Sequence, residues 1–434
     1  MPKDKKINMT NTPLPKQTDV VIIGGGIVGV SAAWHLAVAG YRVTLCEKGM
    51  IGGEQTGRNW GWCRKTLRDP KEIPLMQQSA RDWQDKKVFG NLETGYRTTG
   101  IVYFSGRQHG DTEHYVNWLS SIRDFGLDSH MITASEVDQL IPGGTNLPRD
   151  GALFTPSDGC AEPSLAASVI CTAAADAGAK IFQNTAVRGL ERYAGQVREV
   201  VTEKGAIRCD AVVLAGGAWS RLFAGQEGIN LPALNVMGSA MRTLPFPNGP
   251  NISVAGRRFG WRKRADGGYI VSQADATIFD IVPDSFRLVW AFRPQLLQGL
   301  RQLRLRFGAA FFHELKRARK WALDETTPFE LERIANPAPA QAVLEEAAQR
   351  LKKAFPVFDQ IQIAHRWGGL IDVTPDALPL IGTSASVPSL IFATGFSGHG
   401  FGLGPGGGRL AAELVIGGST CVDPSPFAPA RFGL

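Results

Sequence analysis

Three glycines and one acid near the start of the chain have the spacing of a dinucleotide-binding site. Gly24, Gly26 and Gly29 follow an apolar run, and Glu47 lies 18 residues beyond the last of them. Glycine at these places permits a tight turn, close approach of a pyrophosphate and close helix–strand packing, while a carboxylate at this distance can accept hydrogen bonds from a ribose. The pattern predicts a site for an ADP-containing cofactor and does not distinguish NAD from FAD.

A strand, a helix and a second strand must position these residues. Residues 20–23 are typical of a buried strand, a helical pattern continues to Gly40, and residues 42–46 form the next strand, which ends on Glu47. This order puts the glycines at a helix N-terminus, where free N–H groups can face a phosphate. A glycine-rich turn without a ligand is disfavoured because the strand, the helix, the second strand and the acid are all present. A membrane span over residues 20–39 is disfavoured because glycines crowd its first third.

Two further segments are predicted to return to the cofactor. Residues 48–66 form a glycine-marked loop with polar and aromatic side chains, placed to reach the phosphates and the ring of the cofactor. Residues 212–214 form an apolar strand followed by Gly216 and Gly217, and we expect this strand to join the same sheet. An ordinary strand-to-helix turn is the alternative for this second transition.

The middle of the chain has the pattern of a separate antiparallel sheet. Residues 231–335 contain alternating strands, with a hairpin that turns at residues 266–268. Helices are predicted over residues 163–178 and 341–355, where apolar spacing agrees with the signals at the ends. Residues 365–408 then lead back to the first domain through a glycine-dense turn.

Length and composition indicate a globular protein of two packed domains. The chain has 434 residues, of which 44% are hydrophobic. Its six cysteines show no C-x-x-C pair, which favours reduced thiols and a cytoplasmic location over disulfides or a metal site. Residues 1–17 are charged and lack the apolar core of a signal peptide, so we expect a disordered lead-in.

The net charge of +7 is concentrated in one stretch. Residues 299–321 hold seven Lys or Arg against one Glu, interleaved with Leu, Phe and Trp. A solvated helix face and a basic amphipathic surface that rests on anionic lipid are both compatible with this pattern. Nucleic acid is disfavoured as a partner, because no recognised nucleic-acid module accompanies the stretch.

The order of several motifs resembles one enzyme family. The nucleotide fingerprint, GEQTGRNWGW, LAGGAWSRL, TPDALPLIG and GFSGHGFGLGPGGG follow one another along the chain. Together they resemble the FAD-dependent amino-acid oxidase family, which includes D-amino-acid, glycine and sarcosine oxidases, and they are most similar to the bacterial L-amino-acid deaminases. The resemblance implies an α/β fold, with a Rossmann-like FAD-binding domain of the glutathione-reductase type and an inserted antiparallel-sheet substrate domain.

The resemblance also implies domain boundaries. We expect the FAD-binding domain to comprise residues 18–90, 150–230 and 360–434, and the substrate domain residues 91–149 and 231–359 with a small insertion at about 275–325. In the deaminases this insertion contacts the membrane, which favours the lipid interpretation of residues 299–321. The deaminases also carry a transmembrane helix before the fingerprint and this chain shows none, so peripheral attachment to the inner membrane face is the expected alternative to a purely cytoplasmic location.

The resemblance implies FAD, bound non-covalently because Gly369 stands where sarcosine oxidases have the cysteine that bonds their flavin. Glu47 is expected to hold the ribose, residues 53–58 to line the pyrophosphate, and residues 398–404 to offer donors to the negative charge of reduced flavin. The predicted cofactor-binding residues are Gly24, Gly26, Ile27, Val28, Gly29, Glu47, Lys48, Gly53, Glu54, Gln55, Thr56, Gly57, Arg58, Val187, Ala215, Gly216, Trp219, Gly369, Gly398, His399, Gly400, Phe401 and Gly402.

Three residues are predicted to act on the substrate. Arg262 matches the family arginine that grips the substrate carboxylate, for which a guanidinium fork is well suited. Trp62 aligns with a pocket position of the deaminases, and His399 lies where they place an aromatic side chain over the flavin; Trp261 and Phe401 are weaker pocket candidates.

The implied reaction is oxidative deamination of an α-amino acid, with the L form slightly favoured. A hydride passes from the α-carbon to flavin N5, and the imino acid is hydrolysed to a 2-oxo acid and ammonia. The electrons then pass to oxygen or to a respiratory-chain acceptor. Oxidation of a secondary amine, such as sarcosine, a proline-like acid or an opine, or of a D-amino acid, is the alternative. A flavin-containing assembly subunit with an inactive pocket is the alternative from another functional class.

Overall fold

A mostly parallel sheet, with one antiparallel edge strand, carries the predicted nucleotide-binding unit. The structure is a computed structural model that describes residues 13–85, 87–105, 110–145, 147, 150–273, 277–294 and 304–434. In these residues the sheet has the strand order β21-β22-β13-β1-β2-β9. Its strands are β1 (Val20–Ile23), β2 (Val43–Cys46), β9 (Lys180–Phe182), β13 (Ala211–Leu214), β21 (Leu380–Thr383) and β22 (Leu390–Thr394). The strand predicted over residues 212–214 is confirmed, because β13 pairs with β1 in parallel.

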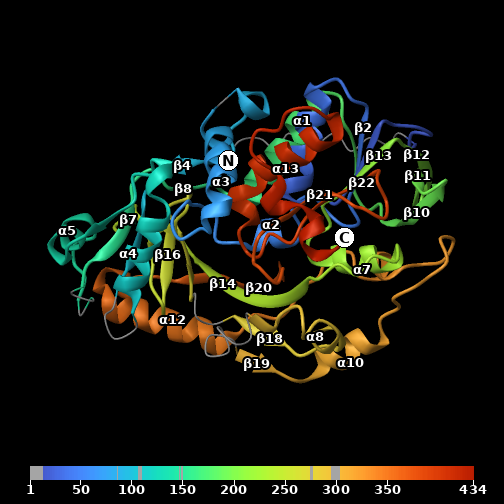
Figure 1. The fold of residues 1–434 in the computed structure, drawn as a ribbon. Helices are drawn as coiled ribbons and strands as arrows, with labels where there is room; N and C mark the ends of the chain where they lie inside the picture. The colour runs from blue at the N-terminus through green and yellow to red at the C-terminus, as the bar shows by residue number, and fades with distance from the viewer. Residues whose placement is uncertain are drawn as a thin grey trace.

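Helices cover this sheet and form its core. They include α1 (Ile27–Val38), α2 (Gln55–Arg58), α3 (Ile73–Gln84), α6 (Pro163–Asp176), α7 (Ser220–Gln226) and α13 (Gly400–Ile416). In Figure 1, α1 and α13 lie together on one face of the sheet. The small sheet of β10 (Val187–Tyr193), β11 (Gln196–Thr202) and β12 (Gly205–Arg208) packs on the other face, where its apolar residues share a core with β1 and β13. The α6 bounds agree with the helix predicted over residues 163–178.

The second sheet is mostly antiparallel and, among the described residues, has ten strands. They are β5 (Ile101–Phe104), β6 (His130–Ile132), β7 (Ala152–Thr155), β14 (Leu234–Thr243), β15 (Ser253–Ala255), β16 (Gly260–Lys263), β17 (Tyr269–Ser272), β18 (Ile278–Asp280), β19 (Arg304–Arg306) and β20 (Ile363–Val373). The predicted hairpin is present as β16 and β17, and the predicted helix over 341–355 is α12 (Gln341–Ala354). Figure 1 shows α12 beneath this sheet and the long β14–β20 pair running between the two halves of the molecule.

Strand membership differs from the expected domain boundaries in two places. β7 and β20 fall within the residues assigned to the FAD-binding domain, yet both belong to the second sheet. β20 pairs with β14 from Ile363 to Val373, and its last residues reach the loops of the parallel sheet. The same strand therefore serves both halves.

The remaining elements are short. They include β3 (Trp62–Cys63), β4 (Arg97–Thr98), β8 (Gly159–Cys160), α4 (Asp111–Ser121), α5 (Ala134–Leu140), α8 (Pro283–Arg287), α10 (Ala309–Lys316) and α11 (Pro328–Leu331). We call β18, α8, β19 and α10 the insertion module; in Figure 1 they lie together at the bottom of the molecule. Residues 1–12 of the predicted lead-in and residues 299–303 of the basic stretch lie outside the described residues. In the part of the chain that is described, no helix is long and apolar enough to cross a membrane.

Candidate active site

The glycine turn after β1 brings three backbone segments into contact. Gly24 has a φ of +108°, and a Cβ there would lie 2.4 Å from the carbonyl oxygen of Ala215. A Cβ on Gly29 would lie 2.0 Å from the carbonyl oxygen of Gly24. These glycines let α1 and the loop after β13 pack against the turn, and Gly26 begins α1 without a capping side chain. The first amide of the helix, Ile27 N, donates to Thr56 Oγ1 at 2.9 Å, and the binding of an anion at the amides that follow stays a prediction.

Glu47 is fixed at the end of β2 by backbone amides. Its two carboxylate oxygens accept hydrogen bonds from Gly25 N and Gly49 N, each at 2.7 Å. Burial raises the pKa of Glu47, while the two amides act in the opposite direction. Each oxygen keeps a second acceptor site, which is what a ribose hydroxyl needs.

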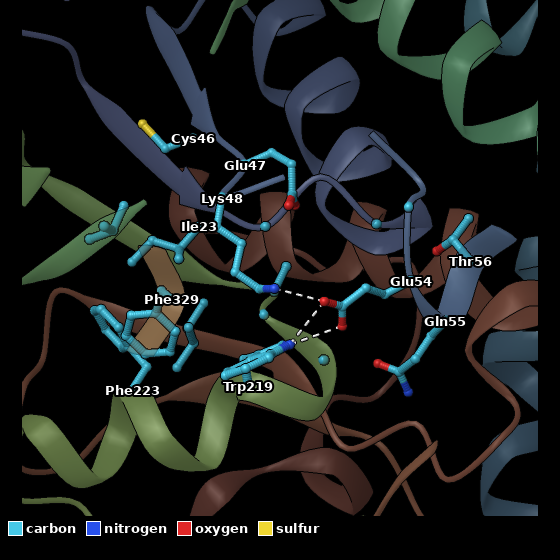
Figure 2. A pocket seen from close by; sticks show the side chains of 18 of the residues that line it. Ile23, Cys46, Glu47, Lys48, Glu54, Gln55, Thr56, Trp219, Phe223 and Phe329 are labelled. Carbon is cyan, nitrogen blue, oxygen red and sulfur yellow. Dashed lines mark hydrogen bonds and ion pairs between the residues drawn. The ribbon is translucent and has the colours of Figure 1, made fainter. Parts of the chain in front are cut away.

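A cavity opens from this turn and is lined by many of the predicted cofactor-binding residues. Figure 2 shows an apolar end with Ile23, Phe223 and Phe329, and a polar part where Lys48 and Trp219 converge on Glu54. Lys48 Nζ lies 2.7 Å from Glu54, and Trp219 Nε1 donates to the same carboxylate at 2.9 Å. The predicted residues that line it are Gly24, Gly26, Glu47, Lys48, Gly53, Glu54, Gln55, Thr56, Val187, Ala215, Gly216 and Trp219.

The structure does not place every predicted residue on this cavity. Ile27, Val28 and Gly29 are buried inside α1, and Phe401 is buried against Trp83 with the ring centroids 5.4 Å apart. Gly402 lets α13 approach β3, since a Cβ there would lie 3.1 Å from Cys63 Cα. The aromatic residues Phe223 and Phe329 were not predicted, because each lies in an ordinary helical or loop pattern and the fold brings them together at this cavity.

The loop that carries Gln55 and Arg58 is tied to β20. Gln55 Nε2 donates to Asp372 at 2.8 Å, and Asp372 also accepts from Gly395 N at 2.7 Å. Arg58 donates to the Gly368 carbonyl at 3.0 Å, and a Cβ on Gly369 would lie 3.2 Å from the Arg58 side chain. This strand therefore holds the loop and the Gly398 turn in fixed relation; Asp372 was not predicted.

His399 lies at the start of α13, beside a buried acid that the sequence analysis did not identify. Its Nδ1 is 3.1 Å from Glu72, which has no exposed side-chain surface. His399 and Arg68 lower the pKa of Glu72 against the effect of burial, and burial together with the Arg68 charge lowers the pKa of His399 to about 4. An ionised Glu72 can only accept, so the His399 Nδ1–H donates to it. Nε2 is left as the free acceptor of the ring.

Arg262 is enclosed and already paired. It is 1% exposed, its Nη1 lies 2.8 Å from Glu162, and its Nε donates to the Trp60 carbonyl at 2.5 Å. Glu162 also accepts from Ala265 N and from the half-exposed Arg97. The guanidinium therefore holds the tryptophan loop, and Trp60 and Trp62 pack edge to face with their ring centroids 4.7 Å apart. Trp261, the weaker candidate, is buried in the core beneath the second sheet.

These features fit an extended dinucleotide. A helix N-terminus, the carboxylate that follows β2 and an aromatic end occur in the order that an ADP group requires. The turn at Gly398, which has a φ of +81°, is linked to the Gln55 loop through Asp372, which accepts from Gln55, from Gly395 N and from Ser397 N.

Comparison with known proteins identifies the family. A sequence model of the DAO family, described as FAD dependent oxidoreductase, matches residues 19–414. The chain belongs to this family. Sarcosine oxidase subunit beta from Rhodobacter capsulatus is 24% identical, with 98% of this chain and 89% of that protein covered. Glycine oxidase from Pseudomonas aeruginosa is 26% identical, with 95% and 98% covered.

A solved structure resembles the chain more strongly. L-amino acid deaminase from Proteus myxofaciens, in complex with anthranilate, is 35% identical with a TM-score of 0.92, and the match covers 98% of this chain and 95% of that one. The predictions of the fold, of FAD as cofactor and of an oxidoreductase are confirmed. The DAO protein described here is an FAD-dependent enzyme that oxidises amino acids or secondary amines.

Proposed function

We propose that this DAO-family protein oxidatively deaminates an α-amino acid, with the L form favoured. The observation that carries the proposal is the match to the Proteus myxofaciens L-amino acid deaminase over nearly the whole of both chains. Bound FAD supplies the acceptor for the α-hydride. FAD is proposed to be non-covalent, because Gly369 has no nucleophilic side chain to bond it.

The pair of His399 and Glu72 is proposed to handle the substrate proton. An amino acid arrives with a protonated amine, and this proton must leave before the α-hydride can move. Ionised Glu72 fixes the His399 ring with Nδ1–H toward itself, which leaves Nε2 to accept the proton. Trp62 is proposed to line the substrate slot, since its ring packs between Trp60 and Tyr103. The imino acid that results is hydrolysed to a 2-oxo acid and ammonia.

Replacing Glu72 with Gln is expected to lower kcat at least tenfold and to move the acid limb of the pH profile downward. The amide no longer requires Nδ1–H, so the ring loses its orientation. Glu72 raises the pKa of His399 by its charge, and its removal leaves burial and the cations of Arg68 and Arg64 to lower that pKa below about 4. Rates measured as kcat/KM against pH would check this, with the exposed Asp69→Asn as the matched control. An acid limb near neutrality that the substitution does not move would contradict the role of the pair.

Anaerobic reduction of the bound flavin by a panel of D- and L-amino acids tests the proposed activity. Bleaching by L-amino acids with release of ammonia supports it. Bleaching only by N-alkyl glycines or proline-like acids, with release of an amine or a cyclic imine, would favour the second candidate, for which the sarcosine oxidase relative is the supporting observation. No bleaching by any amino acid or amine would reject both and favour an assembly subunit. Peroxide production in air separates oxygen from a respiratory acceptor.

Peripheral membrane contact through the insertion module is proposed as well. Its described residues expose a group of aromatic side chains: Phe286 (64%), Trp290 (79%), Phe307 (61%) and Phe312 (53%). The basic residues expected to meet lipid are instead largely paired: Arg317 lies 2.8 Å from Glu332, Arg319 2.9 Å from Asp284, and Lys320 Nζ donates to the Gln226 carbonyl at 2.7 Å. The aromatic group therefore supports attachment to a lipid surface at the inner membrane face better than the charges do.

Replacing Phe307 and Phe312 together with Ser should weaken binding to anionic liposomes at least tenfold. Each exposed ring that enters the interface contributes about 1.5–3 kcal/mol. Cosedimentation with vesicles of mixed neutral and anionic lipid measures the effect, and Tyr193→Ser, an equally exposed aromatic on β10, is the matched control. Equal loss in both variants, or none in either, would remove the membrane proposal.

A further inference from the structure

Two buried donors beside the tryptophan loop, Trp62 Nε1 and Arg68 Nη1, have no hydrogen-bond partner among the described residues, and the half-buried Arg64 lies between them in sequence. Trp62 lies on β3 and Arg64 follows it, while Arg68 ends the next turn, in which Leu67 has a φ of +55°. Arg68 is 3% exposed, and its Nη1 has no hydrogen-bond partner among the described residues. The buried Nε1 of Trp62 likewise has none there. Among the described residues, the Arg64 side chain donates to the Thr66 carbonyl, within its own turn.

The other buried cations of this region are matched by acids. Lys65 lies 3.1 Å from Asp158, and Arg262 lies 2.8 Å from Glu162. Arg68 has the Glu72 and Asp158 carboxylates nearby, but Asp158 is already paired with Lys65, and Glu72 accepts from His399 Nδ1. Among the described residues of this cluster, three cations (Arg64, Lys65 and Arg68) therefore meet two carboxylates (Glu72 and Asp158), and one positive charge is uncompensated.

This charge is costly without a ligand. Burial lowers the pKa of Arg68 to about 9, so the guanidinium still carries its charge at neutral pH. A buried, charged donor without an acceptor forfeits the solvation that it has in water. An anion that accepts from both guanidinium groups would recover it, and a carboxylate matches their planar donors.

The donors also share one wall. The Arg64 guanidinium lies 5.5 Å from the centroid of the Tyr103 ring, and the Trp62 ring centroid lies 6.3 Å from that of Tyr103. The segment that carries Trp62 and Arg64 lies against the start of α13, since a Cβ on Gly402 would lie 3.1 Å from the Trp62 carbonyl oxygen and 3.6 Å from Arg64 N. Arg68 and Arg64 both lower the pKa of His399 by their charge. Cations, aromatic rings and a proton acceptor thus belong to one cluster.

We propose that Arg64 and Arg68 bind the substrate carboxylate, with Trp62 Nε1 as a further donor, and that Arg262 positions the tryptophan loop instead of gripping the substrate. This assignment rests on the proposed function for the identity of the ligand. It specifies a substrate with one carboxylate beside an apolar or aromatic group, because a single positive charge is left uncompensated next to Trp62 and Tyr103.

Binding of two small probes to the FAD-loaded protein tests this assignment. Benzoate carries the carboxylate and benzamide is its neutral analogue, and calorimetry gives the Kd of each. Arg64→Met and Arg68→Met are each expected to raise the Kd of benzoate more than tenfold and that of benzamide less than twofold. Arg64→Lys should recover part of the benzoate affinity, since it keeps the charge without the fork. Arg123→Met, at an exposed arginine away from this cluster, should change neither Kd.

Arg64 is the primary position, because it is only half-buried and its loss should leave the fold intact. The proposal would be overturned if Arg64→Met left the affinity for benzoate unchanged or lowered the affinity for both probes equally. It would also be overturned if the wild-type protein did not bind benzoate more tightly than benzamide. A benzoate-selective loss confined to Arg262→Met would also overturn it and return the role to that residue. The test requires no turnover, so a protein that keeps this selectivity but oxidises no amino acid would reject the proposed function and leave the carboxylate site standing.

Discussion

Gly29→Ala should yield a protein that is purified almost free of FAD. The added Cβ would lie 2.0 Å from the Gly24 carbonyl oxygen and 3.2 Å from its carbon, both backbone atoms that no change of rotamer can move. Helix α1 would have to shift away from the turn after β1, and its N-terminal N–H groups would leave the position that an anion needs. Because the same turn contacts Ala215, the shift would also disturb the loop after β13.

The ratio of flavin to protein absorbance, together with the melting temperature, measures this effect. Gly225→Ala is the matched control, since it lies in helix α7 and a Cβ there would meet no atom within 4 Å. That variant should retain full flavin content and gain up to about 1 kcal/mol of stability from the lower entropy of its unfolded chain. A Gly29→Ala protein with wild-type flavin content would show that the turn tolerates the shift.

Features set by local spacing could be predicted from the sequence. The fingerprint, the helices α6 and α12 and the β16–β17 hairpin each depend on residues within about one or two turns of one another, so their patterns survive in the linear chain. The pairing of β13 with β1 followed from one rule, that an apolar strand ending in glycines joins an existing parallel sheet. These elements appear within a few residues of their expected bounds.

The membership of β20 could not be predicted in the same way. Its sequence, with Gly368 and Gly369 in the middle, lacks a clear alternation of apolar and polar residues. It was therefore assigned to the segment that leads back to the FAD-binding domain. The strand pairs with β14 along its whole length while Asp372 at its end reaches Gln55. Because the strand contacts both the second sheet and the loops of the FAD-binding domain, its residues satisfy two sets of contacts, and neither set gives a clear hydrophobic pattern in the sequence.

The partners of the predicted site residues were missed for a related reason. Glu72 meets His399 across 327 positions of sequence, and Asp372 meets Gln55 across 317. The residue types give no signal, because an acid at the start of a helix normally stabilises that helix. The resemblance identified Arg262 as a clamp by alignment, and the acid that neutralises it, Glu162, lies 100 positions away in the sequence.

Arg262→Met should destabilise the protein by about 3–5 kcal/mol, because it leaves Glu162 as a buried charge without its enclosed partner. Arg262 has 1% and Glu162 9% of its side-chain surface exposed, so water cannot replace the lost contact. The Trp60 carbonyl would also lose its donor, and the tryptophan loop its anchor. Denaturant unfolding of the FAD-loaded protein gives the loss directly.

The double variant Glu162→Gln/Arg262→Met should regain part of the lost free energy of unfolding, because no buried carboxylate then remains without its partner. The amide oxygen of Gln can still accept the hydrogen bonds that Arg97 and Ala265 N donate to Glu162. Arg264→Met is the control on the same hairpin, where the pair with the half-exposed Asp266 should be worth less than about 1 kcal/mol. A stable Arg262→Met protein would show that the pair is not needed for folding. If its affinity for benzoate also fell while that for benzamide did not, the Arg262 guanidinium would bind the ligand carboxylate, and its pair with Glu162 would belong to the ligand-free protein.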